Sequence, residues 1–269
     1  MHKVESRFHR FPFRRATATL LVALLVSVVW YAYARWIEPC SLKTLRVRLS
    51  ETPELTLVHI SDFHFKEDQR YLNRVVRTVN DIEPDLVCFT GDLVEDSRQL
   101  PPVLTAIEQI HAPVFAVPGN WEHWAGTDFS LVEKSCAKTG GSFLVNSSVS
   151  FRNHWTIVGI DNLSTGHAVI EQAFSNVNST ENVIFLTHCP LGVELLGERT
   201  VKLALAGHSH GGQVRLPAVG ALLVPPGTGR YDLGRFDTPN GTLYVSSGIG
   251  TWAIPIRFLC RPEVTVIRL

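Results

Sequence analysis

The part of the sequence that decides the fold is the stretch Gly207-His208-Ser209-His210-Gly211-Gly212-Gln213. It directly follows the apolar run Leu203–Ala206, which predicts a buried strand. Two histidines stand two residues apart on a turn flanked by glycines, and glycine lets the backbone approach a ligand closely. Imidazole is the commonest metal ligand among side chains, and α/β proteins place their chemistry where strands end. We therefore expect His208 and His210 to bind metal, although this motif alone also fits an ordinary polar turn.

Several other polar side chains occupy the same kind of position, directly after an apolar run. They are Asp62, His64, Asp92, Asn120 and His188. Because the carboxyl ends of parallel strands meet at one edge of a sheet, we expect these side chains and the two histidines to lie together. Their oxygen and nitrogen donors, without cysteine, suit Mn, Fe or Zn. A carboxylate between two such cations, about 3.5–4 Å apart, gives a site that activates water for attack at phosphorus.

Apolar runs that alternate with helical periodicities predict an α/β domain from residue 54 onward. The predicted strands cover residues 55–60, 85–90, 114–117, 143–145, 155–160, 183–187, 203–206, 243–246 and 264–269. Helices are predicted around residues 72–82, 104–110 and 129–138, and Pro84 ends the first of them. The polar stretch 175–182 predicts a loop.

The charge balance and the cysteines exclude some classes of function. The chain has 269 residues, with 25 basic and 25 acidic side chains and a pI near 7.2. Without a basic surplus, binding to nucleic acid has no electrostatic support, so none is expected. The five cysteines are odd in number and form no C-x-x-C pair, which argues against a zinc knuckle and a disulfide framework.

The first 53 residues differ from the rest of the chain. A basic tail over 1–15 precedes an uncharged run over 16–34, which is long enough to span a membrane. Aromatic residues gather at its far end, as in an interfacial belt. We therefore predict a single-pass transmembrane helix over 16–37 and a linker over 38–53, followed by the domain at 54–269.

Other interpretations of this segment stay open. A signal peptide normally has a shorter apolar core and a small-residue cleavage site, and Arg14-Arg15 fits a twin-arginine signal poorly. A monotopic anchor lying in one leaflet is the other alternative. Five basic residues precede the span and four follow it closely. The positive-inside rule therefore slightly favours an inner-membrane protein whose domain lies on the outer, periplasmic side.

Taken in order, the expected ligands form five sequence blocks. They are Asp62-Phe63-His64, Gly91-Asp92, Gly119-Asn120, Thr187-His188 and Gly207-His208-Ser209-His210. This order resembles the calcineurin-like metallophosphoesterase superfamily, and the resemblance covers residue 54 to the C-terminus. The stretches 211–217 and 261–265 look like its membrane-associated bacterial branch, which includes phosphodiesterases. The resemblance implies a four-layer α/β/β/α sandwich.

The resemblance also implies a role for each ligand. By it, one ion is bound by Asp62, His64 and His210, the second by Asn120, His188 and His208, and Asp92 bridges the two. The ions are usually Mn, Fe, Zn or Ni, with Mn favoured here. The reaction implied is hydrolysis of a phosphate ester by a hydroxide that two metals activate, in which Asp92 and Asn120 are catalytic.

One position departs from the family pattern. Relatives continue Gly-Asn-His, and that histidine acts near the leaving group, but here Trp121 follows Asn120 and its indole can only donate. Either His123 takes the catalytic role, or the substrate needs no general acid. A leaving phosphate, with a second pKa near ~6, departs unprotonated at neutral pH, which favours a pyrophosphate bond or an activated diester.

Other charged residues are weaker candidates. Arg215 and Arg261 are expected to bind the phosphate of the substrate, because guanidinium matches its oxygens, and surface pairing is the alternative for each. Glu95 and Asp96 are expected on a solvated loop, and His59 is expected to be structural.

The sequence therefore predicts a membrane-anchored, two-metal phosphoesterase whose substrate is membrane-proximal or lipid-linked. Some anchored relatives hydrolyse UDP-2,3-diacylglucosamine, which makes that lipid a candidate by analogy. A phosphomonoesterase acting on phosphoprotein and a non-catalytic scaffold with the same fold are the alternatives. A scaffold is expected to lose ligands, whereas every ligand position of the pattern is filled here.

Overall fold

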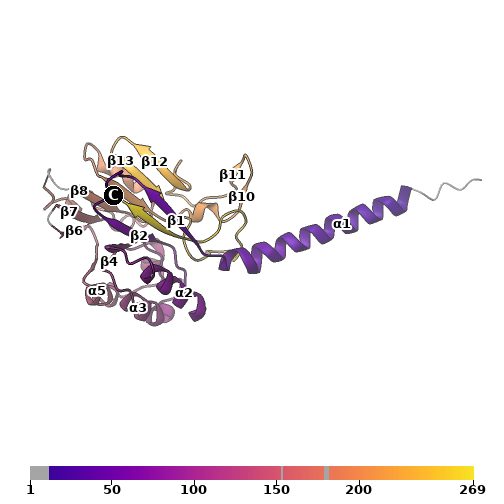
Figure 1. Cartoon of the computed structure of the whole chain (residues 1–269), viewed down its shortest axis with the longest axis horizontal. Helices are drawn as coiled ribbons and strands as arrows, with labels where there is room; N and C mark the ends of the chain where they lie inside the picture. The colour runs from indigo at the N-terminus through magenta and orange to yellow at the C-terminus, as the bar shows by residue number, and fades with distance from the viewer. Residues whose placement is uncertain (1–11, 153, 179–181) are drawn as a thin grey trace, which may run out of the picture.

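The structure, a computed structural model, describes residues 12–152, 154–178 and 182–269. Its domain is built around two six-stranded sheets, and a long helix, α1 (Pro12–Ala32), projects away from that domain (Figure 1). Most of the basic tail expected over 1–15, and part of the loop expected over 175–182, lie outside the described residues.

The first sheet has the strand order β1-β14-β2-β3-β4-β5. Its strands are β1 (Lys43–Arg48), β14 (Glu263–Arg268), β2 (Thr56–Ile60), β3 (Leu86–Phe89), β4 (Val114–Ala116) and β5 (Ser142–Phe143). Strand β14 runs antiparallel to β2, and every other neighbouring pair is parallel. The carboxyl ends of β2, β3 and β4 therefore lie at one edge.

The second sheet has the order β12-β13-β9-β8-β7-β6. Its strands are β12 (Gly234–Thr238), β13 (Gly241–Val245), β9 (Leu203–Ala206), β8 (Asn182–Leu186), β7 (Trp155–Gly159) and β6 (Ser147–Phe151). The four inner strands are parallel, and the two edge strands are antiparallel to their neighbours. A separate hairpin joins β10 (Arg215–Leu216) to β11 (Gly220–Ala221).

Helices cover the outer faces of both sheets. The α-helices of the domain are α2 (Gln69–Asn80), α3 (Leu100–Glu108), α4 (Asn120–Trp124), α5 (Phe129–Lys138) and α6 (Ile170–Ala173). The shorter helical turns are η1 (Tyr33–Ile37), η2 (Glu38–Cys40), η3 (Ser97–Gln99), η4 (Pro190–Leu196) and η5 (His210–Gly212). Helices α2, α3 and α5 pack on the first sheet, while only α6 and η4 cover the second among the described residues.

The alternation of side chains along the strands explains these layers. In β3, Leu86 and Cys88 lie in the core between the two sheets, whereas Val87 and Phe89 lie in the core under the helices. Both faces of such a strand are apolar because both are covered. The four-layer α/β/β/α arrangement expected from the sequence is confirmed, with a thin fourth layer.

The domain begins earlier than expected. Strand β1 lies within the stretch 38–53, expected to be a linker, and pairs in parallel with β14 along its whole length. Its sequence hides this role because most of its side chains are exposed and three of its six residues are basic. Charged side chains are common on an edge strand, where they prevent pairing with further chains. The first sheet therefore includes part of the expected linker.

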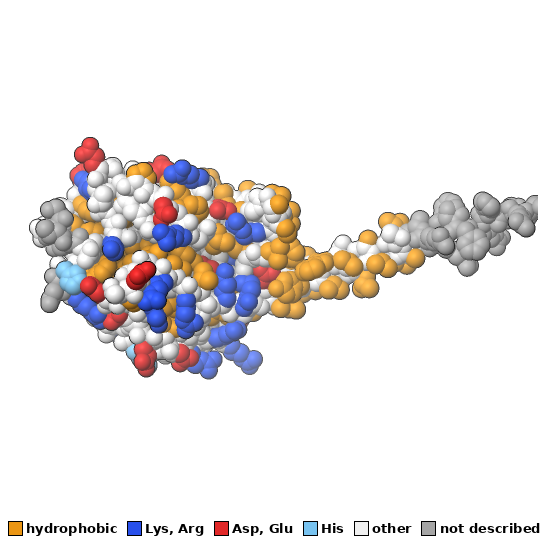
Figure 2. All heavy atoms as spheres, turned by 45° about the horizontal axis from the view of Figure 1, so that its top comes forward, with side chains coloured by type: hydrophobic (Ala, Val, Ile, Leu, Met, Phe, Trp, Pro, Cys, Tyr) orange, Lys and Arg blue, Asp and Glu red, His pale blue; other side chains and the backbone are white. Residues whose placement is uncertain are grey.

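Helix α1 projects from the domain, and most of its described apolar side chains are exposed (Figures 1 and 2). Among the described residues, Thr17–Cys40 is the segment long and apolar enough to cross a membrane, and little of it is buried against the domain. A signal sequence near an N-terminus can pass the same test of length and hydropathy. The segment thus fits the predicted anchor by length and hydropathy alone.

Candidate metal centre

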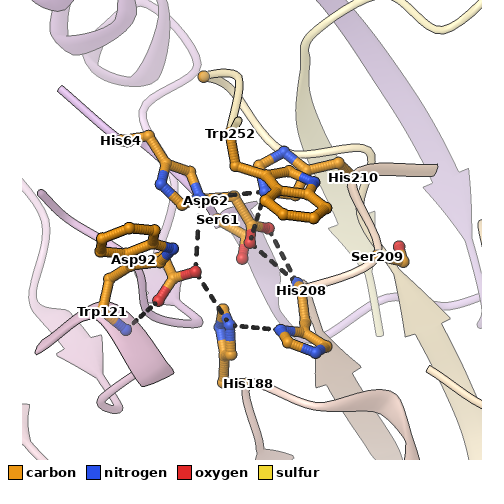
Figure 3. A network of polar contacts seen from close by, with 12 residues as sticks. Ser61, Asp62, His64, Asp92, Trp121, His188, His208, Ser209, His210 and Trp252 are labelled. Carbon is orange, nitrogen blue, oxygen red and sulfur yellow. Dashed lines mark hydrogen bonds and ion pairs between the residues drawn. The ribbon is translucent and has the colours of Figure 1, made fainter. Parts of the chain in front are cut away.

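Side chains that follow five strands, three parallel strands of the first sheet and two of the second, meet in one place (Figure 3). Strand β2 leads to Asp62 and His64, β3 to Asp92, β4 to Asn120, β8 to His188, and β9 to His208 and His210. We call these seven residues the central cluster. All seven are buried. The structure therefore brings together every residue that the sequence analysis expected to bind metal.

Within the central cluster, donor atoms face one another at short range. Nε2 of His64 lies 3.0 Å from Nε2 of His210 and 3.4 Å from Oδ2 of Asp92. On the other side, Nε2 of His188 lies 3.2 Å from the same Asp92 oxygen and 3.0 Å from Nδ1 of His208. Asp92 thus lies between two groups of ligand atoms (Figure 3).

In each of the two groups, the ligand atoms are close enough together to bind one metal ion. The ligand atoms of Asp62, His64 and His210 lie within 4.8 Å of one another, and so do those of Asp92, His188 and His208. Asn120 belongs to the second group, because its Oδ1 lies 3.1 Å from Nε2 of His188. The structure thus contains two adjacent candidate clusters of metal ligands.

The far ring nitrogens of two histidines are tied to backbone carbonyls. Nδ1 of His188 donates to the carbonyl oxygen of Thr90 at 2.6 Å, and Nε2 of His208 donates to that of Pro226 at 2.7 Å. A carbonyl oxygen can only accept, so these far nitrogens carry the protons. The nitrogens that face the cluster are therefore the ones free to bind a cation, as in protein metal sites where outer partners fix each imidazole.

The electrostatic surroundings hold Asp92 and His208 in the form that binds a cation, but not His188. Burial lowers the pKa of His188, yet the charge and hydrogen bond of Asp92 outweigh burial and raise that pKa well above its usual value. Burial raises the pKa of Asp92, but the charge and hydrogen bond of His188 and the charge of His64 outweigh burial, so its pKa falls to about 2. Burial, and then the charge of His188, lower the pKa of His208 to about 4. At neutral pH Asp92 is therefore a carboxylate and His208 is neutral.

Close backbone approaches hold the loops of the centre in place. A Cβ atom added at Gly119 would lie 2.1 Å from Oδ1 of Asp92, and one added at Gly207 would lie 1.8 Å from Oγ of Ser61. Any larger residue at these two positions would displace a ligand loop. The glycines before Asn120 and before His208 are therefore required by space.

A buried glutamate that the sequence analysis missed ties two ligand loops together. The Glu122 carboxylate accepts the backbone N–H groups of Gly119, Asp92 and Leu93, at 2.6 to 2.9 Å. Its position three residues after Gly119, in the first turn of a short helix, was the available signal, since Glu at this position commonly caps a helix start. Glu122 therefore fixes Asp92 relative to Asn120.

The expectation that Glu95 lies on a solvated loop needs correction. Its Oε1 lies 3.1 Å from Nδ1 of His64 and 3.1 Å from Nζ of Lys66. Burial raises the pKa of Glu95, but the hydrogen bonds and charges of His64 and Lys66 lower it below its usual value. Glu95 therefore orients His64 from behind, whereas its neighbour Asp96 contacts exposed Arg98.

A cavity of about 320 Å³ opens directly onto the central cluster. Besides cluster residues, its lining consists of Trp121, Trp124, Ser164, Pro225, Pro226 and Trp252. The ring of Trp252 lies 6.5 Å from that of His210, and the ring of Trp121 lies 6.1 Å from that of His64. The ligands thus form the polar floor of a pocket with apolar walls, which is the usual build of a small-molecule site.

His123 does not reach this cavity. Its Nε2 lies 2.6 Å from Oδ1 of Asp161, and its ring stacks on that of His167 at 4.4 Å with an interplanar angle of 5°. We call His123, Asp161 and His167 the outer cluster. Their ligand atoms lie within 4.8 Å of one another. Because ring lone pairs lie in the ring plane, two parallel rings cannot both point at one ion between them, so this arrangement is a stacked contact.

The two arginines expected to bind substrate are held elsewhere. Arg215 donates to the carbonyl oxygen of Gly211 and pairs with Asp232 at 2.8 Å. Arg261 donates to the carbonyl oxygens of Ser41 and Leu42. Among the described residues that line the cavity, neither arginine is present. Both contribute to the packing around the end of the N-terminal helix and the hairpin.

Comparison with known proteins agrees with the geometry. Residues 55–212 match the family model described as calcineurin-like phosphoesterase. The metallophosphoesterase YkuE of Bacillus subtilis is 30% identical over 260 residues, which cover 89% of each chain. The phosphodiesterase YaeI of Escherichia coli is 27% identical, over 95% of this chain and 98% of its own.

Two further similarities concern a named activity and the fold. The UDP-2,3-diacylglucosamine pyrophosphatase LpxG of Chlamydia muridarum is 26% identical, over 96% of this chain and 98% of its own. The solved structure of TT1561 of Thermus thermophilus superposes with a TM-score of 0.50 at 14% identity, over 74% of this chain and 91% of that one, which is a likeness in fold. The family match and the similarity to YkuE together show that this chain belongs to the calcineurin-like phosphoesterases, a family of hydrolases.

Proposed function

We propose that this chain hydrolyses the phosphodiester or pyrophosphate bond of a lipid-linked substrate with the help of two divalent cations, Mn²⁺ being favoured. One ion would be held by Asp62, His64 and His210 and the other by Asn120, His188 and His208, with Asp92 between the two groups. Buried oxygen and nitrogen donors without a thiolate suit Mn, Fe or Zn and support a divalent cation of this kind. When bound, two such cations supply an activated water and offset the charge that develops at phosphorus.

The side chains of the protein position the reacting groups. Asp92 faces both ligand groups and also accepts the backbone N–H of Trp121 at 2.9 Å. This contact fixes the start of helix α4 and therefore the side chain of Asn120. The aromatic walls of Trp121 and Trp252 exclude bulk water, which strengthens the electrostatic effect of every charge at the cavity floor.

The composition of the cavity wall is the observation that carries the choice of substrate. Outside the central cluster, the described residues of the wall include no acid, no lysine and no arginine, and Ser164 is its polar member. A wall without a general acid suits a leaving group that departs without a proton, such as a phosphate with a second pKa near ~6. A wall without a cationic side chain is poorly suited to the dianion of a phosphomonoester. The similarity to LpxG, named for a pyrophosphatase activity, supports the same choice.

The apolar N-terminal helix supports a substrate that resides in a membrane. We propose that α1 crosses the inner membrane, and the slight excess of basic residues before the span supports a domain on the periplasmic side. A membrane-anchored enzyme encounters lipid-linked substrates at its own surface. UDP-2,3-diacylglucosamine is the specific candidate, taken from the name of LpxG.

The test compares three substrates on the full-length protein in detergent micelles. Bis-p-nitrophenyl phosphate, p-nitrophenyl phosphate and UDP-2,3-diacylglucosamine are each assayed with Mn²⁺ and with a chelator. We expect the pyrophosphate to be cleaved fastest, the diester more slowly and the monoester least, all only with metal. A preference for the monoester, or turnover that survives the chelator, would contradict the proposal. Mn²⁺ binding without turnover of any substrate would support a scaffold instead.

A further inference from the structure

The end of the N-terminal helix is fixed to the domain at one particular segment. The ring of Trp30 packs edge-on against Phe258 at 5.4 Å, and the backbone N–H of Arg257 donates to the carbonyl oxygen of Ala34 at 2.9 Å. The carboxylate of Glu38, which is buried, accepts the backbone N–H of Cys260. The helix therefore leaves the domain from the segment 257–260.

Hydrogen bonds of Gln213 connect the segment 257–260 to the wall of the cavity. The backbone N–H of Phe258 donates to the carbonyl oxygen of Gln213 at 2.8 Å. The Gln213 side chain accepts the backbone N–H of Trp252 at 2.9 Å and donates to its carbonyl oxygen at 3.2 Å. Phe258 and Gln213 therefore connect the helix to Trp252, which lines the cavity. The cavity therefore lies on the side of the domain from which α1 departs.

Large apolar side chains are exposed on this same side. They are Leu216 (39% exposed), Val219 (69%), Leu222 (55%), Leu223 (71%), Ile254 (63%) and Leu259 (53%), and we call them the apolar edge. Figure 1 shows the hairpin β10–β11, which carries part of this edge, on the α1 side of the domain, and Figure 2 shows apolar side chains there that continue onto the helix. Exposed apolar patches of this kind mark surfaces that bind a protein, a ligand or a membrane.

Of these three kinds of partner, the position of the apolar edge favours a membrane. Tyr31 and Trp36, both exposed at the end of the helix, are of the type that lies at the headgroup level of a bilayer. The edge lies beside the point where such a helix meets the domain. Leu259 directly follows Phe258, which packs on Trp30. The backbone N–H of Leu222 donates to the carbonyl oxygen of Val214, which bridges to Phe258.

Leu223 stands two residues before cavity-lining Pro225, and Ile254 stands two residues after Trp252. A bilayer that contains α1 would therefore meet the apolar edge and the cavity mouth together.

We propose that the apolar edge inserts into the leaflet in which α1 ends, so that the cavity mouth opens at the bilayer surface and admits the phosphoester of a lipid whose acyl chains stay in the membrane. This inference rests on the proposed function for the identity of the substrate. The insertion itself rests only on the contacts and exposures of the edge and on the apolar helix.

Depth-dependent quenching tests the insertion without reference to activity. Full-length protein carrying Cys40→Ser, which removes the exposed cysteine, receives Leu223→Cys or, as a control, Leu131→Cys. Leu131 is 41% exposed on helix α5, which lies far from α1 (Figure 1). Each cysteine is labelled with an environment-sensitive fluorophore, and the protein is placed in phosphatidylcholine–phosphatidylglycerol nanodiscs with or without brominated acyl chains. We expect a blue-shifted label at 223 that is quenched at least twofold more strongly than the label at 131.

Equal, water-like emission from both labels would overturn the proposal. So would protection of the label at 223 by a second copy, detected as a disulfide between unlabelled Leu223→Cys chains together with no quenching by brominated lipid. Either result is independent of whether the protein hydrolyses any substrate.

A matched activity measurement tests the delivery of the lipid. Leu222→Ser combined with Leu223→Ser is compared with wild type and with Leu131→Ser on two substrates. We expect at least a tenfold loss on UDP-2,3-diacylglucosamine embedded in vesicles and an unchanged rate on water-soluble bis-p-nitrophenyl phosphate. Equal rates on the vesicle substrate would overturn delivery along the edge. If wild type cleaves neither substrate, the proposed function fails, and the quenching result still decides whether the edge inserts.

Discussion

The central cluster and the outer cluster use the same residue types but are built differently. All members of the central cluster are buried, and five of them, Asp62, His64, Asp92, His208 and His210, adopt left-handed backbone with φ between 41° and 66°. No member of the outer cluster has such a backbone, and its side chains range from buried Asp161 to exposed His167. The central donors converge, whereas the outer rings lie parallel.

This difference in backbone and burial indicates that the central cluster is the one preorganised for a ligand. A left-handed backbone costs an ordinary L-residue about 1–2 kcal/mol, so its repetition at the ends of β2, β3 and β9 is held in place by the surrounding loops. Glu122 and the close approaches at Gly119 and Gly207 provide that support. The outer cluster joins α4 to the loop after β7, and its members are held without left-handed backbone of their own: Asn146 accepts the backbone N–H of Asp161 and donates to the carbonyl oxygen of His167.

We expect the two clusters to differ most in their effect on turnover when one aspartate is removed from each. Asp92→Ala deletes the carboxylate between both ligand groups, so we expect turnover of bis-p-nitrophenyl phosphate to fall by about 10³-fold or more. Asp161→Ala removes a partner of His123 and should lower turnover by less than about tenfold, through loosening of α4. Initial rates with saturating Mn²⁺ measure both effects. Similar losses in the two variants would break the distinction between the clusters.

The second prediction concerns the carboxylate behind His64. Glu95→Gln removes the charge that orients this imidazole, and loss of such an outer partner typically lowers metal affinity about 10–100-fold. Asp96→Asn is the matched control, because Asp96 pairs with exposed Arg98. Titration of the apo protein with Mn²⁺, followed by calorimetry, gives both affinities. An unchanged affinity in Glu95→Gln would show that His64 is held by its packing alone.

The third prediction concerns acid stability at the back of the central cluster. Nε2 of His59 bonds to Oγ1 of Thr90, whose carbonyl oxygen accepts from His188, and burial lowers the pKa of His59 to about 3. The unfolded chain binds this proton as the pH falls below about 6.5, while the folded chain stays neutral until about pH 3. Stability contributed by neutral His59 is therefore present above pH 6.5 and is lost as the pH falls.

The measurement is the free energy of unfolding in urea at pH 7.5, 6.5 and 5.5, for wild type and for His59→Gln, which keeps a donor. We expect wild type to lose up to about 1.4 kcal/mol more per pH unit below 6.5 than the variant does. Parallel pH profiles for the two proteins would mean that His59 is protonated in the folded state.

The smallest effect is expected at His123. Because its ring faces Asp161 and does not line the cavity, His123→Ala should change turnover by less than about threefold, equally for substrates with good and poor leaving groups. Rates on a p-nitrophenyl diester and an alkyl diester give the comparison. A loss confined to the alkyl diester would identify His123 as the general acid and place the outer cluster within the catalytic machinery.

The sequence was informative where a local pattern sets the structure. Helix α5 and strand β9 have the predicted bounds, because apolar periodicity and caps define them. The gathering of seven ligands at one edge followed from placing each after a parallel strand. The left-handed turns after these strands could not be predicted, since Asp and His also occupy many ordinary turns.

The remaining features depend on contacts between residues far apart in the sequence. Glu122 bonds to Leu93 and Glu95 contacts His64, across 29 and 31 positions, which no local pattern reveals. Arg215 pairs with a nearby aspartate, as long cationic side chains often do. Strand β1 was missed because its partner β14 lies at the other end of the chain.

Metal stoichiometry tests the central claim most directly. Full-length protein is freed of metal with a chelator, titrated with Mn²⁺, and analysed by mass spectrometry of bound metal while turnover of bis-p-nitrophenyl phosphate is followed. The account predicts two ions per chain, with full turnover reached only when the second ion binds, and no ion retained at the outer cluster. Full turnover with a single ion, or turnover in protein stripped of metal, would contradict it.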